Sequence, residues 1–169
     1  MIESWHPNFG DCLFVAIDQV LARGHAGAVV LNSDSPTLPP ALLAETARAL
    51  AQPGDRAVLG PSSDGGYYLL GLKAPHRRLF EDVAWSTAQV ARQTRERAAE
   101  IGLDVHVLPE WYDVDDEVTL LRLCRELLLE IGGVKRCCAP HTADFLEELR
   151  NRNATFGRRI ACSERAGEW

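Results

Sequence analysis

The chain has 169 residues, of which 46% are hydrophobic and 25% are charged, and its net charge at pH 7 is −6. This length suits one domain with a buried core. The acidic balance argues against nucleic acid or an anionic membrane as the main partner. The five cysteines are odd in number and contain no CxxC pair, so neither a disulfide framework nor a zinc site is expected.

Nothing in the sequence predicts a targeting signal or a membrane anchor. No stretch approaches the roughly 18 apolar residues of a membrane helix, and the N-terminus lacks the basic and apolar regions of a signal peptide. We therefore expect a cytoplasmic protein without a membrane partner.

The hydrophobic pattern predicts helices and strands that alternate along most of the chain. The predicted helices span 11–23, 40–50, 86–102, 117–131 and 142–152, and the predicted strands span 28–31, 57–60, 67–72 and 105–107. Asp116 is expected to cap the 117–131 helix, and Ser86, with Gln89 three residues later, is expected to open its helix with a capping box.

The alternation of helices and strands predicts the fold class and the extent of the domain. It favours a single α/β domain over residues 1–153, with a mainly parallel sheet covered by helices on both faces. Residues 154–169 carry no clear pattern and are expected to form a C-terminal tail.

Three polar clusters follow predicted strands or lie between them. They are Ser33-Asp34-Ser35-Pro36, Ser63-Asp64-Gly65-Gly66-Tyr67 and Asp113-Val114-Asp115-Asp116. In an open parallel sheet the carboxyl ends of the strands form one rim, so we expect the clusters to meet there. Carboxylates that meet repel one another unless a cation lies between them. Hard carboxylate oxygens suit Mg²⁺ or Mn²⁺, which neutralise phosphate charge on a substrate.

Each cluster also has a structural interpretation, and the residues alone leave both interpretations open. Asp34 and Ser35 suit a turn, Asp115 or Asp116 suits a helix cap, and Asp64-Gly65-Gly66 suits a hairpin loop. Glycines at this last position also allow a ligand to approach the backbone closely. A calcium loop is disfavoured because Val118 stands where such a loop requires glycine. Asp113 and Asp115 are also disfavoured as a phosphoenzyme motif of the DxD type. Such a motif stands at the end of an early buried strand and needs a later lysine, and Lys135 is the only lysine beyond it.

Three segments occur in a specific order: LNSDSPTLPPALL at 31–43, VLGPSSDGGYYLLGL at 58–72 and WYDVDDEVTLLRL at 111–123. Together they resemble an uncharacterised bacterial family of glycosyltransferase-A-like proteins, over about residues 8–150. The resemblance implies the Rossmann-like fold of the nucleotide-diphospho-sugar transferases. Molybdopterin and phospholactate nucleotidyltransferases share that fold.

The resemblance also implies roles for the polar clusters. Asp34, Asp113 and Asp115 would hold Mg²⁺ or Mn²⁺, which makes Asp34 and Asp115 the leading catalytic candidates. Asp64 is the best candidate for taking a proton from the acceptor. The residues expected to bind a nucleotide-sugar or nucleotide are Ser33, Ser35, Asp64, Gly65, Gly66 and Tyr67. The implied activity is glycosyl transfer or, alternatively, nucleotidyl transfer.

The sequence departs from the family pattern in three ways. Asn32 stands where the family usually has glycine, and Thr119 stands where many members have aspartate. No segment resembles the G-R-x-K-T-R-L loop that is thought to hold the nucleotide. We therefore expect an N-terminally shortened fold that exposes a sheet edge and apolar surface. A non-catalytic remnant that binds a partner or forms a homo-oligomer is the alternative of another class.

Overall fold

A computed structural model of the chain describes residues 6–129 and 138–165. Residue contacts divide these residues into two units. Unit 1 contains the described residues up to Asn32 and the segment Pro40–Tyr112, whereas unit 2 contains Ser33–Pro39 and the described residues from Asp113 onward. The end of the predicted 117–131 helix and residues 166–169 of the predicted tail lie outside the described residues.

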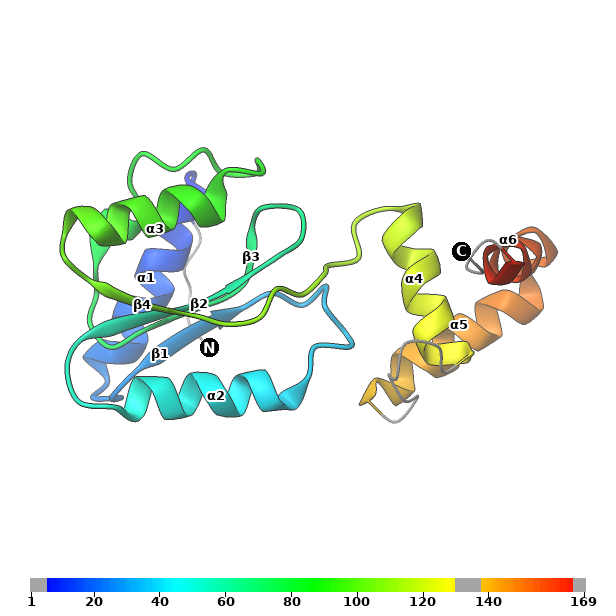
Figure 1. Ribbon diagram of the computed structural model, residues 1–169, viewed down its shortest axis with the longest axis horizontal. Coiled ribbons are helices and arrows are strands. Elements are labelled where there is room, and N and C mark those ends of the chain that lie inside the picture. Colours follow the sequence, from blue (N-terminus) through cyan, green and yellow to red (C-terminus); the bar gives the residue numbers. More distant parts are fainter. Residues whose placement is uncertain (1–5, 130–137, 166–169) are drawn as a thin grey trace. The chain divides into compact units, whose positions relative to one another are not determined.

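Unit 1 is built on a four-stranded sheet with the order β1-β3-β2-β4 (Figure 1). Its strands are β1 (Ala28–Leu31), β2 (Arg56–Pro61), β3 (Tyr67–Leu72) and β4 (Asp104–Val107). Strand β3 runs antiparallel to both β1 and β2, and only β2 and β4 are parallel among the described strands. The α/β class is confirmed, but a mainly parallel sheet is not, since two of the three described pairings are antiparallel.

The short connection between β2 and β3 explains the antiparallel pairing. The Ser62 N–H donates to the Gly66 carbonyl at 3.0 Å and closes a hairpin loop. A connection this short joins only antiparallel neighbours, because a parallel pair needs a long crossover. The hairpin interpretation of Asp64-Gly65-Gly66 is thus confirmed. Segment 58–72 contains two successive strands with no helix between them.

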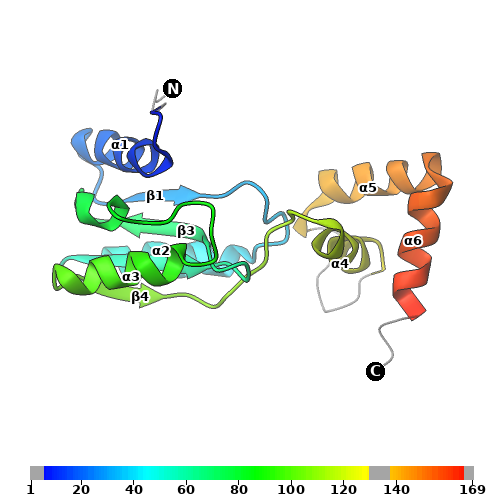
Figure 2. The ribbon, with the colours of Figure 1, turned by 90° about the horizontal axis from the view of Figure 1, so that it is seen from above.

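Helices cover both faces of the sheet (Figures 1 and 2). One face carries α2 (Pro40–Ala51), and the other carries α1 (Phe9–Ala22), the 3₁₀ helix η1 (Arg77–Phe80) and α3 (Val90–Glu100). The core beneath α1 and α3 contains Ile17, Leu59, Leu70, Leu72, Leu79 and Ala98. All of β3 is buried, so this strand lies at the centre of unit 1.

The capping box predicted at Ser86 is wrong, because α3 begins at Val90. Ser86 adopts a positive φ of 62°, whereas an N-cap residue normally has an extended backbone. The preceding turn is held by other bonds. The Thr87 hydroxyl donates to the Ala84 carbonyl at 2.7 Å, and the Ala84 N–H donates to Gln93 Oε1 at 2.7 Å.

Unit 2 is helical and contains α4 (Glu117–Leu128), α5 (Pro140–Arg152) and α6 (Ala154–Arg165). Leu123, Leu127, Leu146 and Ile160 form its core, with Phe156 packed against them. Residues 154–165, for which the sequence shows no pattern, form α6 because Phe156 and Ile160 reach this core. Of all the helices described in either unit, none has the length and apolar composition needed to cross a membrane.

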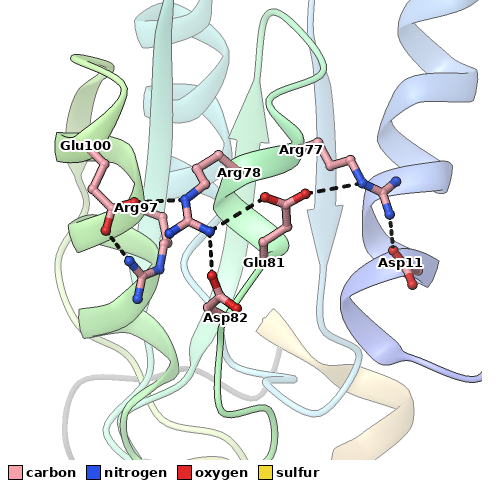
Figure 3. Close-up of polar contacts among 7 residues, drawn as sticks. All are labelled: Asp11, Arg77, Arg78, Glu81, Asp82, Arg97 and Glu100. Atoms are coloured by element: carbon pink, nitrogen blue, oxygen red, sulfur yellow. Dashed lines mark hydrogen bonds and ion pairs between the residues drawn. The ribbon is translucent and has the colours of Figure 1, made fainter.

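Three arginines and four acids form an ion-pair network that links α1, η1 and α3 (Figure 3). Arg78 lies at its centre and contacts Asp82 at 2.6 Å and Glu100 at 2.8 Å. Arg97 also pairs with Glu100. The network continues through Glu81 to Arg77 and Asp11. The hydrogen bonds from Arg78 lower the pKa of Asp82 and of Glu100 below their ordinary values.

We expect Arg78→Ala to lower the melting temperature at pH 7, because it removes the residue that several acids share. A carboxylate whose pKa is lowered in the folded protein stabilises the fold at pH values above its ordinary pKa. That stabilisation is lost as the pH falls. The difference in melting temperature between the unaltered protein and the Arg78→Ala variant should therefore become smaller below about pH 4. Thermal melts at several pH values measure it.

The matched control is Arg92→Ala, which removes an exposed pair with Glu96 and two hydrogen bonds to Gln89, all local to α3 and its N-cap. Isolated surface pairs contribute little to stability, so this variant should melt close to the unaltered protein. Equal melting temperatures for the Arg78 and Arg92 variants at pH 7 would contradict a stabilising role for the network.

The loop between β2 and β3 depends on Gly65. This glycine has a φ of +92°, and a Cβ atom added to it would lie 2.3 Å from the Ala88 carbonyl oxygen. The Gly65 carbonyl accepts the Ala91 N–H at 2.9 Å, which ties the loop to the start of α3. Gly54 has a similar φ of +85°, but no atom beyond its two chain neighbours lies within 4 Å of its added Cβ.

These two glycines separate backbone strain from steric clash. Gly54→Ala should lower the free energy of unfolding by about 1 kcal/mol through strain alone. Gly65→Ala should lower it by about 2–4 kcal/mol, because the overlap with Ala88 adds to the strain. Chemical denaturation of both variants measures the two losses. Equal losses would show that the backbone near Ala88 moves aside without cost.

Candidate functional site

The acidic turn that precedes α4 is organised by Thr119. The Thr119 N–H and hydroxyl each donate to Asp116 Oδ1 at 2.8 Å, which makes Asp116 the N-cap of α4. These bonds lower the pKa of the Asp116 carboxyl below its ordinary value. The Asp115 N–H donates to the same hydroxyl at 3.2 Å. The predicted cap is confirmed, and the threonine that departs from the family pattern stabilises the turn.

Asp113 and Asp115 lie on the same turn, and neither is the cap residue. Asp113 is buried, with 7% of its surface exposed, whereas Asp115 is exposed. Each offers a carboxylate oxygen within 4.8 Å of the other. Two carboxylates this close repel each other unless a cation or a proton lies between them.

The segment around Asp34 belongs to the same unit as this turn. The Val114 N–H donates to the Asp34 carbonyl oxygen at 2.9 Å, so Asp34 lies beside the residue between Asp113 and Asp115. The Asp34 Oδ1 and Ser35 Oγ atoms are buried, and neither has a hydrogen-bond partner among the described residues. Buried polar atoms are normally paired, so these two atoms are suited to contact a ligand.

A second contact holds this segment in place, and the sequence interpretation missed it. The Thr37 hydroxyl donates to Glu126 Oε2 at 3.3 Å, and Arg122 Nε donates to Glu126 Oε1 at 2.9 Å. Thr37 and Glu126 are both buried. The sequence carries one signal for this contact: Glu126 is an acid beside Leu127 on the apolar side of an amphipathic helix.

The remaining predicted residues lie in the hairpin loop of unit 1. Asp64 is exposed, and its Oδ1 accepts the Gly66 N–H at 2.7 Å. The Ser63 N–H donates to the Trp111 carbonyl at 2.9 Å, which anchors the loop. That this cluster meets the other two stays a prediction.

Tyr67 is packed inside unit 1, with its ring edge-on to Trp85 at a centroid distance of 6.5 Å. Burial raises the pKa of Tyr67. Its hydroxyl has no hydrogen-bond partner in the part of the chain that the structure describes. That Tyr67 binds substrate stays a prediction.

A pocket of about 430 Å³ lies beside the acidic turn, between α4 and α6. This volume is within the range of small-molecule sites. Its lining residues are Val114, Asp115, Asp116, Glu117, Leu120, Leu121, Phe156 and Arg159. Arg159 is the cation among them, and its Nη1 atom contacts Glu117 Oε1 at 2.6 Å. The pocket thus combines carboxylates, a guanidinium group and apolar walls.

A solved structure from Desulfovibrio desulfuricans G20, described as a "putative nucleotide-diphospho-sugar transferase", is similar to this chain with a TM-score of 0.68 and 30% sequence identity. The match covers 72% of this chain and 53% of the other, so the chain spans about half the length of that protein. No curated protein matches the sequence.

A family model described as "Uncharacterized protein conserved in bacteria (DUF2064)" matches residues 2–87, which is about half of the chain. The structural neighbour agrees with the resemblance to a glycosyltransferase-A-like bacterial family, and that prediction is confirmed. The chain belongs to the DUF2064 family of bacterial proteins.

Proposed function

We propose that this chain belongs to a metal-dependent glycosyltransferase that acts on a nucleotide-diphospho sugar. The observation that carries the proposal is the hydrogen bond from Val114 to Asp34, which joins two of the three polar clusters within unit 2. The description of the similar structure as a nucleotide-diphospho-sugar transferase supports the substrate class. Nucleotidyl transfer by the same fold is the second candidate activity.

The residues of unit 2 fit a hard divalent cation. Asp34 offers a buried carboxylate oxygen without a described partner, and Asp113 and Asp115 offer oxygens within 4.8 Å of each other. Mg²⁺ and Mn²⁺ prefer such oxygens and complete their coordination with water and substrate phosphate. When bound, the ion would neutralise the diphosphate and stabilise it as a leaving group. Asp116 is not among the acids whose oxygens meet in this cluster, and its Oδ1 atom caps α4.

The pocket beside the acidic turn suits the diphosphate end of the donor. Arg159 supplies a guanidinium group, which forms strong hydrogen bonds with phosphate oxygens. Ser33 and Ser35 add hydroxyls next to Asp34, and the Ser35 hydroxyl is already buried without a described partner. Leu120, Leu121 and Phe156 provide apolar walls. These residues would bind and orient the donor.

Asp64 is the proposed base for the acceptor. Its Oδ1 atom is held by the Gly66 N–H, which orients the carboxylate at the tip of the hairpin loop. In the proposed reaction the acceptor hydroxyl attacks the anomeric carbon and gives its proton to Asp64. The bond from that carbon to the diphosphate oxygen breaks, and the diphosphate leaves with the electron pair.

We expect the chain to bind Mn²⁺ in isothermal titration calorimetry, and we expect Asp113→Asn to weaken that affinity by at least about tenfold. The substitution removes one negative ligand, and even losses outside the coordination sphere cost metal sites this much. Asp116→Asn is the matched control on the same turn. It should keep the Mn²⁺ affinity while it weakens the cap of α4.

Two results would contradict this assignment. One is a chain that binds no Mn²⁺ at all. The other is an equal loss of affinity in the Asp113 and Asp116 variants, which would mean that the turn attracts cations only through its total charge.

We expect UDP- or GDP-sugars to bind the chain in the presence of Mn²⁺ and to lose affinity when the ion is chelated. Asp34→Asn should remove the Mn²⁺-dependent part of the nucleotide-sugar binding, because it removes a carboxylate ligand of the ion that would bind the diphosphate. Fluorescence titration with a panel of nucleotide sugars measures both effects. A chain that binds Mn²⁺ but no nucleotide sugar would favour the non-catalytic alternative.

A further inference from the structure

Glu126 is a buried acid on the apolar side of α4. It is 8% exposed, and its helix neighbours Leu123 and Leu127 belong to the core of unit 2. Burial of a carboxylate costs free energy even when the charge is paired, and apolar residues often replace buried ion pairs without loss of stability. The stability of α4 therefore does not explain why an acid occupies this position. The groups that its two oxygens contact indicate a different role.

The two oxygens of Glu126 contact groups from different parts of unit 2. The Oε1 atom accepts a hydrogen bond from Arg122 Nε at 2.9 Å, one helical turn earlier on α4. This pair offsets the charge of the acid and restrains its side chain. The Oε2 atom accepts the Thr37 hydroxyl at 3.3 Å, from a residue that lies 89 positions away in the sequence. The acid thus connects α4 to the Ser33–Pro39 segment.

Thr37 belongs to a tight turn that begins directly after Asp34. The Leu38 N–H donates to the Ser35 carbonyl at 3.0 Å and closes this four-residue turn. Pro36 occupies the second position, where its ring fixes the backbone φ. A turn closed in this way moves as one piece, so a bond at Thr37 also restrains Ser35 and the adjoining Asp34.

Asp34 therefore lies between two hydrogen bonds that attach its segment to the rest of unit 2. Its own carbonyl accepts the Val114 N–H at 2.9 Å, which attaches it to the acidic turn. Three residues later, Thr37 attaches the same segment to Glu126. Two attachment points define the direction of a short segment, whereas a single point would let it rotate. The place of the Asp34 carboxylate within unit 2 thus depends on both bonds.

We propose that Glu126, acting through Thr37, is a positioning residue for Asp34 as a ligand of the divalent cation. This inference rests on the proposed function, since it concerns the same cation. Both oxygens of Glu126 already accept hydrogen bonds, so we assign it no place in the coordination of the ion. By holding the segment before the cation arrives, it reduces the conformational entropy that is lost on binding. The contact thereby raises the affinity for the cation.

Thr37→Val tests this role, because valine has nearly the shape of threonine and cannot donate to Glu126. The Mn²⁺ affinity in isothermal titration calorimetry should fall about tenfold, as it does when groups that orient metal ligands are removed. Thr37→Ser keeps the hydroxyl and should restore the affinity. Thr46→Val is the matched control, because Thr46 is equally buried and donates to the Leu42 carbonyl within α2 of unit 1. It should leave the Mn²⁺ affinity unchanged.

Glu126→Gln separates position from charge. Glutamine keeps the shape of the side chain and its hydrogen bond with the Thr37 hydroxyl, but it carries no charge. We expect this variant to keep most of the Mn²⁺ affinity. A large loss in Glu126→Gln without a loss in Thr37→Val would show that the acid attracts the cation by charge alone, and would overturn the proposal.

Amide hydrogen exchange tests the same role in the absence of metal. The Val114 N–H reports the bond to Asp34, and the Thr119 N–H, which donates to Asp116 Oδ1, is a reference at the same end of α4. In Thr37→Val the exchange of Val114 should become about five- to tenfold faster, and that of Thr119 should not change. Equal changes at both amides, or none at Val114, would overturn the proposal.

The two measurements distinguish the failure of this inference from the failure of the proposed function. A chain that binds no Mn²⁺, but in which Thr37→Val speeds exchange at Val114, would contradict the metal site and support the positioning of Asp34. A chain that binds Mn²⁺ equally well with and without the Thr37 hydroxyl would support the metal site and overturn the positioning role.

Discussion

The burial of β3 between β1 and β2 is the constraint on which the rest of unit 1 depends. Tyr68, Leu69, Leu70 and Leu72 are all fully buried, so the strand contributes apolar area to both faces of the sheet. Both hydrogen-bonded ladders of the antiparallel pairs use this one strand. The Tyr68 carbonyl also receives the Asn32 N–H, which determines where β1 ends and the Ser33–Pro39 segment begins.

Unit 2 relies on polar contacts to hold its acidic residues. Asp116 and Thr119 hydrogen-bond to each other at the start of α4. Asp113 and Asp115 are the acids of the turn that do not cap the helix. The buried contact between Thr37 and Glu126 and the bond between Val114 and Asp34 then attach a second segment to this turn. The segment is thus held by the Asp34 carbonyl and by the Thr37 side chain, while Asp34 Oδ1 has no hydrogen-bond partner among the described residues.

The proposed metal site depends on hard oxygens and on a buried atom without a described partner, both in unit 2. The ion pairs around Arg78 lie between α1, η1 and α3, and they stabilise the helical layer on one face of the sheet in unit 1 (Figure 3).

Local features could be predicted because neighbouring residues decide them. The apolar periodicity located the strands closely and most of the helices approximately, and the N-cap at Asp116 follows from a hydroxyl and a carboxylate three residues apart. The start of α3 could not be predicted in this way. Ser86 and Gln89 match a capping box, but Gln93 and Thr87 bond to Ala84 instead and shift the helix start to Val90.

By itself the sequence determined the α/β class, the family and the three polar clusters, because short motifs and periodicity carry that information. Only the tertiary structure decided how β3 is inserted between β1 and β2, that residues 154–165 are helical, and that Val114 bonds to Asp34. Each of these depends on contacts between segments far apart in the chain. The packing of Phe156 and the hydrogen bond that Glu126 accepts from Thr37 could not be predicted, because their partners lie in distant segments.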